Sequence, residues 1–181
     1  MKESKIVVIR GYLSAGKSTT FENLKASKKM KDWLFLDFAA IRKMFNNNKN
    51  SQIEFADRTF YASLRELVKT GKNILTQETS EDIIMKKIGS VIKKNKYNII
   101  VIALTVSPET SYKRAAARSK IKGKKPRTKK EVFDNYKARK LKLDKESRLI
   151  DTEKLTRKQV VDRIIKIIYF KKLLKTFAYP K

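Results

Sequence analysis

Eight residues near the N-terminus have the types and the spacing of a phosphate-binding loop. The segment Gly11-Tyr-Leu-Ser-Ala-Gly16-Lys17-Ser18 matches G-x-x-x-x-G-K-[ST] at every fixed position. Its two glycines allow the backbone to turn successive N–H groups inward, towards phosphate oxygens. The Lys17 ammonium would neutralise the β- and γ-phosphates, and the Ser18 hydroxyl would bind Mg²⁺. The sequence therefore predicts a site for ATP and Mg²⁺ formed by Gly11, Ser14, Ala15, Gly16, Lys17, Ser18 and Thr19.

The composition limits what other chemistry is available. The 181 residues include no Cys, which excludes disulfides, thiolate metal sites and cysteine nucleophiles. They also include no His, the commonest general base and metal ligand. Catalysis must therefore use carboxylates, Lys, Arg, hydroxyl groups or the backbone.

The charge is strongly positive and points to anionic partners. Forty-five Lys and Arg face 18 Asp and Glu, a formal net charge of +27. Nucleic acid, nucleotides, phosphorylated metabolites and acidic membrane surfaces all remain open as partners, and so does a general compositional bias. The sequence contains neither a secretory signal pattern nor an apolar run of about 18 residues, so we expect a cytoplasmic protein with no membrane segment.

Short β-branched segments alternate with segments of helical periodicity. Strands are expected at 5–10, 33–37, 73–76, 97–106 and 148–151, and helices at 17–27, 38–45, 53–70, 80–95, 107–119, 128–145 and 156–174. This alternation predicts an α/β fold, the three-layer P-loop NTPase type, with a mostly parallel five-stranded sheet and helices on both faces. We expect a single domain over residues 1–181, in which residues 107–145 form a helical basic lid.

Three observations favour a kinase over a GTPase or a motor. The strand at 98–104 has no Asp or Glu at its end, so the carboxylate expected of motors and many GTPases is missing there. The guanine-reading pattern Asn-Lys-x-Asp does not occur. Ten Lys or Arg and no acidic residue lie between Thr110 and Lys130, which is typical of a mobile lid over a transferring phosphoryl group.

The sequence resembles the zeta-toxin and polynucleotide-kinase-like group of P-loop kinases, which also includes chloramphenicol phosphotransferase. The residues that carry the resemblance are the phosphate loop, Asp37, Arg118, Arg127 and the segment Leu149-Ile-Asp-Thr152. The resemblance implies that an acid at the end of the second strand deprotonates an acceptor hydroxyl. It also implies that an acid and a Thr at the end of the third strand bind the acceptor, while lid arginines hold the phosphates.

Asp37 matches the first acid of the D-x-D-x-x-[RK] form of this pattern, whereas the D-x-x-R form would place the acid at Ala39. Positions 37 and 39 share a face of an extended segment, so Asp37 could still reach the acceptor, and the resemblance implies that Asp37 is the catalytic base. The alternative is an Asp that caps the following helix. Arg42 either binds the acceptor or pairs with Asp37.

At the end of the third strand, the acid of the resemblance aligns with Gln77 and its Thr with Thr79. Glu78 either replaces the missing acid or is solvated. We therefore expect Glu78 and Thr79 to be substrate-binding residues, and Glu78 to be the second candidate for the base.

Arg114 and Arg118 lie four residues apart and share one helix face. Arg118 and Arg127 match the lid arginines of the resemblance, so both are predicted to be catalytic and Arg114 to bind ATP. A planar guanidinium can hold two phosphate oxygens at once. The alternative is an ordinary solvated basic helix.

These observations predict an ATP-dependent phosphotransferase that acts on a hydroxyl of a small molecule, nucleotide or nucleotide sugar, zeta-toxin-like in type. An antitoxin protein would then be a partner. The alternatives are a nucleic-acid-binding P-loop ATPase and a polynucleotide 5′-hydroxyl kinase. Weak nucleic-acid binding is compatible with each of them.

Overall fold

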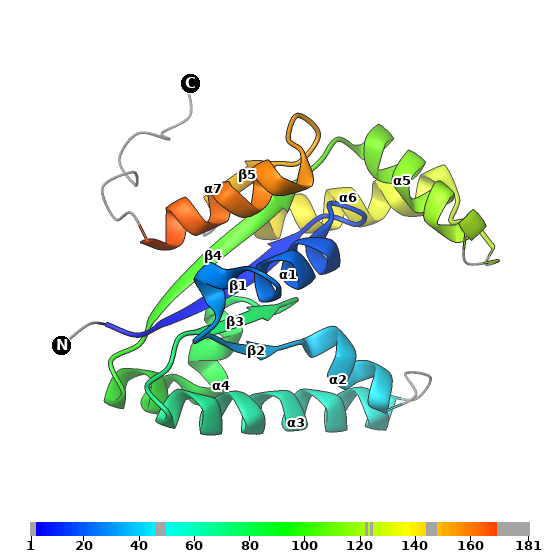
Figure 1. The fold of residues 1–181 in the computed structure, drawn as a ribbon. Coiled ribbons are helices and arrows are strands. Elements are labelled where there is room, and N and C mark those ends of the chain that lie inside the picture. The colour runs from blue at the N-terminus through cyan, green and yellow to red at the C-terminus, as the bar shows by residue number, and fades with distance from the viewer. Residues whose placement is uncertain (1–2, 46–49, 122, 124, 144–147, 170–181) are drawn as a thin grey trace.

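A parallel β-sheet lies at the centre of the molecule, with helices on both of its faces (Figure 1). The computed structural model describes residues 3–45, 50–121, 123, 125–143 and 148–169. The strands are β1 (Lys5–Gly11), β2 (Leu34–Leu36), β3 (Ile74–Gln77), β4 (Asn98–Thr105) and β5 (Arg148–Asp151). The helices are α1 (Lys17–Lys25), α2 (Phe38–Met44), α3 (Asn50–Lys69), α4 (Glu81–Lys94), α5 (Pro108–Ile121), α6 (Lys129–Leu143) and α7 (Arg157–Tyr169), with a short 3₁₀ helix η1 (Lys28–Met30).

The strands are arranged in the order β2-β3-β1-β4-β5, and every neighbouring pair is parallel. β1 is the central strand: Ile6 lies opposite Ile74 of β3 on one side and Ile99 of β4 on the other. Because all five strands run the same way, their carboxyl ends meet at one edge, where ligands bind in open α/β sheets. The predicted three-layer α/β fold is confirmed, and the sheet is parallel throughout.

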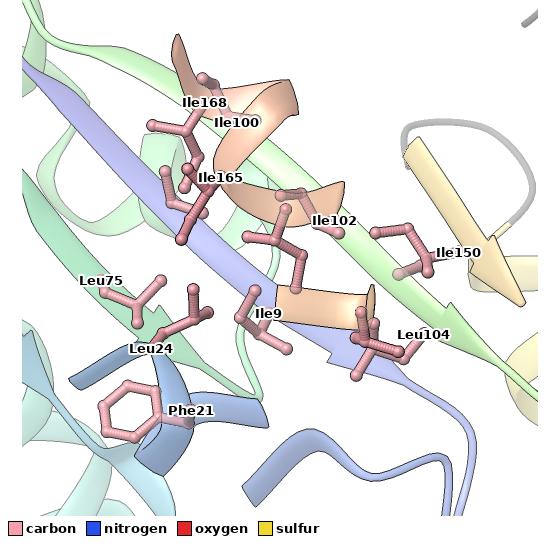
Figure 2. Packing of buried hydrophobic residues seen from close by; sticks show 14 of the residues in the cluster. Ile9, Phe21, Leu24, Leu75, Ile100, Ile102, Leu104, Ile150, Ile165 and Ile168 are labelled. Atoms are coloured by element: carbon pink, nitrogen blue, oxygen red, sulfur yellow. The ribbon is translucent and has the colours of Figure 1, made fainter. Parts of the chain in front are cut away.

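β1 is buried on both faces, which explains its uninterrupted apolar run. Its side chains alternate between two clusters. Val7 and Ile9 join the cluster formed with α1 and α7, whereas Ile6 and Val8 join the cluster formed with α3 and α4. Figure 2 shows the first cluster, in which sheet residues meet Phe21, Leu24, Ile165 and Ile168. Two buried layers hold β1, and with it the start of the phosphate loop, in a fixed position.

Several element ends differ from the predicted ones. The first helix ends at Lys25, because the Ser27 hydroxyl accepts a hydrogen bond from Lys29 N and starts η1. β2 is shorter than predicted, with three residues. The end of the last predicted helix, residues 170–174, lies outside the described residues. Within the described ranges, no helix has both the length and the apolar character needed to cross a bilayer.

The two helices of the predicted lid are present as α5 and α6. They lie side by side, beyond the carboxyl end of β4 (Figure 1). Pro108 is the first residue of α5, and the Ser107 hydroxyl caps the helix by accepting from Thr110 N at 3.2 Å. A proline suits this position because its missing N–H would have no partner inside the helix.

Candidate active site

The loop between β1 and α1 has the backbone geometry of a phosphate cradle. Gly11 has φ of +149°, and a Cβ at this position would lie 2.3 Å from the carbonyl oxygen of Leu104, so only glycine allows β1 to approach β4 here. Ser14 and Gly16 have φ of 57° and 91°, which turns successive N–H groups into one concavity. A Cβ on Gly16 would meet no described atom within 4 Å. An anion at this point would also face the positive end of α1.

The Lys17 ammonium lies at the base of this loop. Its Nζ donates to the carbonyl oxygens of Gly11 at 3.2 Å and Tyr12 at 2.9 Å. Glu78 Oε1, from the residue that follows β3, is 3.2 Å away. The Lys17 side chain is only 10% exposed, so this ion pair is well shielded from solvent. Three oxygens therefore fix the cation where the phosphates of a nucleotide would end.

A cleft of about 570 Å³ opens in front of the loop. Its walls come from the loop and the start of α1, from α5, and from the connection between β5 and α7. The lining residues are Leu13, Ser14, Ala15, Gly16, Lys17, Ser18, Thr19, Thr20, Glu78, Arg114, Arg118, Thr152, Leu155, Arg157 and Val160. The predicted phosphate-loop residues from Ser14 to Thr19 all lie here.

Arg114 is fixed in this cleft by the chain after β5. Its guanidinium donates to the hydroxyl of Thr152 at 3.2 Å and to the carbonyl oxygen of Thr152 at 3.1 Å. The Thr152 hydroxyl in turn donates to the carbonyl oxygen of Thr105 at 3.0 Å. Arg118 lies one turn further along α5 and is exposed, so its guanidinium is available to a ligand in the cleft.

The base of the lid is attached to the phosphate loop. The Ser111 hydroxyl of α5 donates to the carbonyl oxygen of Leu13 at 2.6 Å. The ring of Tyr136 from α6 stacks on Tyr12, with centroids 4.0 Å apart and planes 21° from parallel. These contacts join the arginine-bearing helix to the loop that would bind the phosphates.

A carboxylate after β5 supports the start of the same helix. Glu153 accepts from the backbone N–H and the hydroxyl of Ser107 and from the hydroxyl of Thr110. These hydrogen bonds lower the pKa of Glu153 from its ordinary 4.5 to about 2. Glu153 is therefore ionised across the whole neutral range, and it faces the positive end of α5.

The parallel sheet and the glycine loop with Lys17 can be compared with the folds and sites of known proteins. A family model described as an AAA domain matches residues 6–142. The chain belongs to this AAA domain family. A comparison with curated protein sequences gives no match.

Solved structures share the fold of this AAA domain. A provisionally assigned kinase from Chloroflexus aurantiacus superposes with a TM-score of 0.66 at 14% identity, covering 93% of this chain and 97% of that one. The tunicamycin resistance protein of Deinococcus radiodurans gives 0.64 at 16% identity, covering 92% and 96%. Shikimate kinase from Acinetobacter baumannii gives 0.57 at 17% identity, covering 98% and 97%. These likenesses establish the P-loop kinase fold, and the narrower zeta-toxin-like resemblance stays a prediction.

On the other side of Lys17, the AAA domain brings together the ends of β2 and β3. Asp37 Oδ1 accepts from Ala39 N at 2.8 Å and from Ala40 N at 3.2 Å, so Asp37 caps α2. The same oxygen accepts from the side-chain amide of Gln77 at 2.8 Å. The alternative interpretation, in which Asp37 caps the following helix, is therefore confirmed. All three hydrogen bonds end on Oδ1, which still allows Oδ2 to face an acceptor hydroxyl.

Thr79 and Arg42 have structural partners in this region. The Thr79 hydroxyl lies 2.8 Å from the hydroxyl of Tyr61, and burial raises the pKa of Tyr61 above its ordinary 10.0. The Arg42 guanidinium lies over the ring of Phe38, 5.6 Å from its centroid. Within the part of the chain that the structure describes, Arg42 forms no ion pair with Asp37, so that alternative is not realised.

β4 is one neighbour of β1 in the sheet, and its end carries no acidic residue. The other neighbour is β3, and it supplies Glu78, whose φ of 65° turns the residue sharply out of the strand. The interpretation of Glu78 as simply solvated is wrong, because the side chain is 31% exposed and paired with Lys17. Parallel pairing of β1 with β3 is a tertiary contact, and the sequence offered no signal for it.

The structure leaves a predicted lid arginine outside the cleft and adds lining residues that were not predicted. Arg127 is exposed and lies outside the lining of the cleft, in the connection between α5 and α6. Thr152, Leu155 and Arg157 do line the cleft and were not predicted as site residues. The signal for Thr152 was its place at the carboxyl end of a predicted strand, where ligands of parallel sheets bind.

The residues present fit a nucleotide with Mg²⁺. Ser18 lines the cleft beside Lys17, and hydroxyl and phosphate oxygens are the ligands that Mg²⁺ prefers, with water completing its shell. Within the described ranges, no three carboxylates gather into a metal site of their own. Ser18 would hold a Mg²⁺ ion together with phosphate oxygens of a nucleotide.

Proposed function

We propose that this chain transfers the γ-phosphate of Mg²⁺-ATP to a hydroxyl group of a small molecule, nucleotide or nucleotide sugar. The observation that carries the proposal is the Lys17 ammonium, held within 3.2 Å of Glu78 at the base of a glycine loop. A cation in this position can offset the charge that develops as the γ-phosphate moves.

Each site residue has a role in this reaction. The N–H groups from Ser14 to Thr19 bind the phosphates, and Ser18 holds Mg²⁺. Asp37 accepts the proton of the acceptor hydroxyl, since three hydrogen bonds fix its carboxylate and leave Oδ2 outside them. Arg114 and Arg118 bind the phosphate oxygens from the α5 side, and Arg127 joins them only if the connection between α5 and α6 folds towards the cleft.

The acceptor binds on the side of Asp37, Arg42, Glu78 and Thr79. Zeta-toxin-like specificity would make the acceptor a nucleotide sugar and would add an antitoxin protein as a partner. A small acidic protein encoded beside this chain would support that version.

The test is transfer of label from γ-labelled ATP to a panel of nucleosides, nucleotides, nucleotide sugars and 5′-hydroxyl oligonucleotides. Wild-type protein should label one acceptor class, and Lys17→Ala should label none while its circular dichroism spectrum and melting temperature stay close to wild type. Lys25→Ala is the matched control, because Lys25 is an exposed lysine of the same helix. Transfer by Lys17→Ala at the wild-type rate would disprove the proposal.

A further inference from the structure

The excess positive charge is concentrated in the two helices beyond the cleft. We call residues 108–143 (α5, α6 and their connection) the basic arm. The basic arm has 14 basic and 3 acidic residues, a net charge of +11 in 36 residues. The other 145 residues have a net charge of +16. The charge per residue in the arm is thus almost three times that elsewhere, which a uniform compositional bias does not explain.

Four lysines of the arm are regularly spaced on its exposed surface. Lys113 and Lys120 of α5 are seven residues apart, as are Lys130 and Lys137 of α6, and all four are exposed. Seven residues are almost two helical turns, so each pair shares one helix face with about 10.5 Å between its members. Within the described residues, none of the four has a carboxylate within 4.0 Å.

The acidic residues of the arm cancel little of this charge. Glu131 is occupied at the start of α6, where it accepts from Thr128 N at 2.7 Å, and hydrogen bonds to Thr128 lower its pKa. Glu109 lies in the first turn of α5, next to the cleft end of the arm. Asp134, four residues after Lys130 and three before Lys137, is the remaining acidic residue of the arm.

We propose that Lys113, Lys120, Lys130 and Lys137 of the basic arm bind the phosphate backbone of a nucleic acid. Phosphates of one strand follow each other at about 3.4 Å along a duplex, so a 10.5 Å lysine pair spans about three of them. A membrane surface fits less well, because an interfacial helix needs large apolar side chains beside its cations. Among the described side chains of the arm, Ile121 at the end of α5 is the one large apolar side chain that is exposed, so the arm lacks the continuous apolar face of an interfacial helix. Binding is expected to be independent of base sequence, since the arm contributes cations and few exposed aromatic groups.

The test measures fluorescence anisotropy of a labelled DNA duplex of about 20 base pairs, long enough to cover the arm. It compares wild type with the arm variant Lys113→Gln/Lys120→Gln/Lys130→Gln/Lys137→Gln. The matched control is Lys86→Gln/Lys87→Gln/Lys93→Gln/Lys94→Gln on α4, which removes the same charge from four exposed lysines with the same seven-residue spacing. The full-length protein is used throughout, and salt is varied.

The arm variant should bind at least about tenfold more weakly at low salt, and the slope of log K against log salt should fall by about 3 to 4, at about 0.9 for each lost phosphate contact. The α4 variant should stay within about twofold of wild type. Equal losses in both variants would show that only net charge matters, and would overturn the proposal. Arm-dependent binding to phosphatidylserine vesicles with no oligonucleotide binding would overturn it as well. None of the four arm lysines lines the cleft, so the arm variant should transfer phosphate to a small-molecule acceptor at the wild-type rate, and loss of that turnover and loss of nucleic-acid binding are separate results.

Discussion

Asp37 and Gln77 connect the carboxyl ends of two neighbouring strands through one hydrogen bond, 2.8 Å from Nε2 of Gln77 to Oδ1 of Asp37. The next residue, Glu78, pairs with Lys17 instead. The two carboxylates that follow β2 and β3 therefore have different partners: Asp37 is held by amide groups, and Glu78 by the cation of the phosphate loop. We therefore expect Asp37 and Glu78 to have different roles in the proposed reaction.

Asp37→Asn should lower kcat by at least about 10²-fold with little change in KM for ATP, because a general base typically contributes 10²- to 10⁴-fold. Asn keeps an oxygen that can cap α2 and accept from Gln77, so the melting temperature should stay close to wild type. Steady-state kinetics with the labelled acceptor measure this. Retained phosphoryl transfer would remove Asp37 as the base and make Glu78 the next candidate.

Glu78→Gln removes the carboxylate beside Lys17, while the backbone carbonyl oxygens of Gly11 and Tyr12 remain as partners of the ammonium. We expect an altered ATP affinity, because the balance of charge at the phosphate end of the cleft changes by one unit. Isothermal titration calorimetry with ATP measures this affinity. An unchanged affinity together with a lost kcat would assign the base role to Glu78.

Gly11→Ala should destabilise the fold more than a positive φ alone can explain. The new Cβ would lie 2.3 Å from the carbonyl oxygen of Leu104, and neither backbone can move freely within a sheet. Gly71→Ala is the control, because Gly71 also has positive φ (71°) but no described atom within 4 Å of its Cβ position. In urea unfolding, Gly71→Ala should cost about 1 to 2 kcal/mol and Gly11→Ala about 3 kcal/mol or more. Equal costs would mean that the contact with Leu104 is unimportant.

Tyr136→Ala should weaken the attachment of α6 to the phosphate loop. The stacked pair with Tyr12 is worth about 0.5 to 1.5 kcal/mol beyond the area it buries. We expect a lower melting temperature and a higher KM for ATP, since the lid is then held less often over the loop. Tyr136→Phe keeps the ring and should behave like wild type. A KM that rises in Tyr136→Phe as much as in Tyr136→Ala would point to the hydroxyl and not to the stack.

Glu153 should make the attachment of α5 sensitive to acid. Its pKa is depressed in the folded protein, from 4.5 to about 2, so its stabilising effect is complete above pH 4.5 and is lost as the pH falls to about 2. The melting temperature of Glu153→Gln should therefore lie below that of wild type near neutral pH. This difference in melting temperature should disappear as the pH falls from 4.5 to about 2. A difference that stays constant over this range would contradict the role of the charge.

The sequence determined much of the local structure, because the signals are short-range. The strand before Gly11 is a continuous apolar run, the glycines of the loop tolerate positive φ, and Ser80 caps α4 by accepting from Ile83 N. Spacing along one helix also placed Arg114 and Arg118 on one face, and both line the cleft. These features depend on residues close together in the chain, which is why a single sequence is enough to predict them.

Tertiary structure alone decided which distant groups meet. The order β2-β3-β1-β4-β5 places β3 beside β1, and this brings Glu78 within 3.2 Å of Lys17, 61 positions earlier in the chain. It also brings Thr152 to Arg114, and it leaves Arg127 outside the cleft. The pairing of parallel strands depends on how whole helices pack across both faces of a sheet, a property that no local spacing encodes. The sequence therefore determined that this chain has a phosphate loop, while the packing of the sheet decided which carboxylate and which arginines face it.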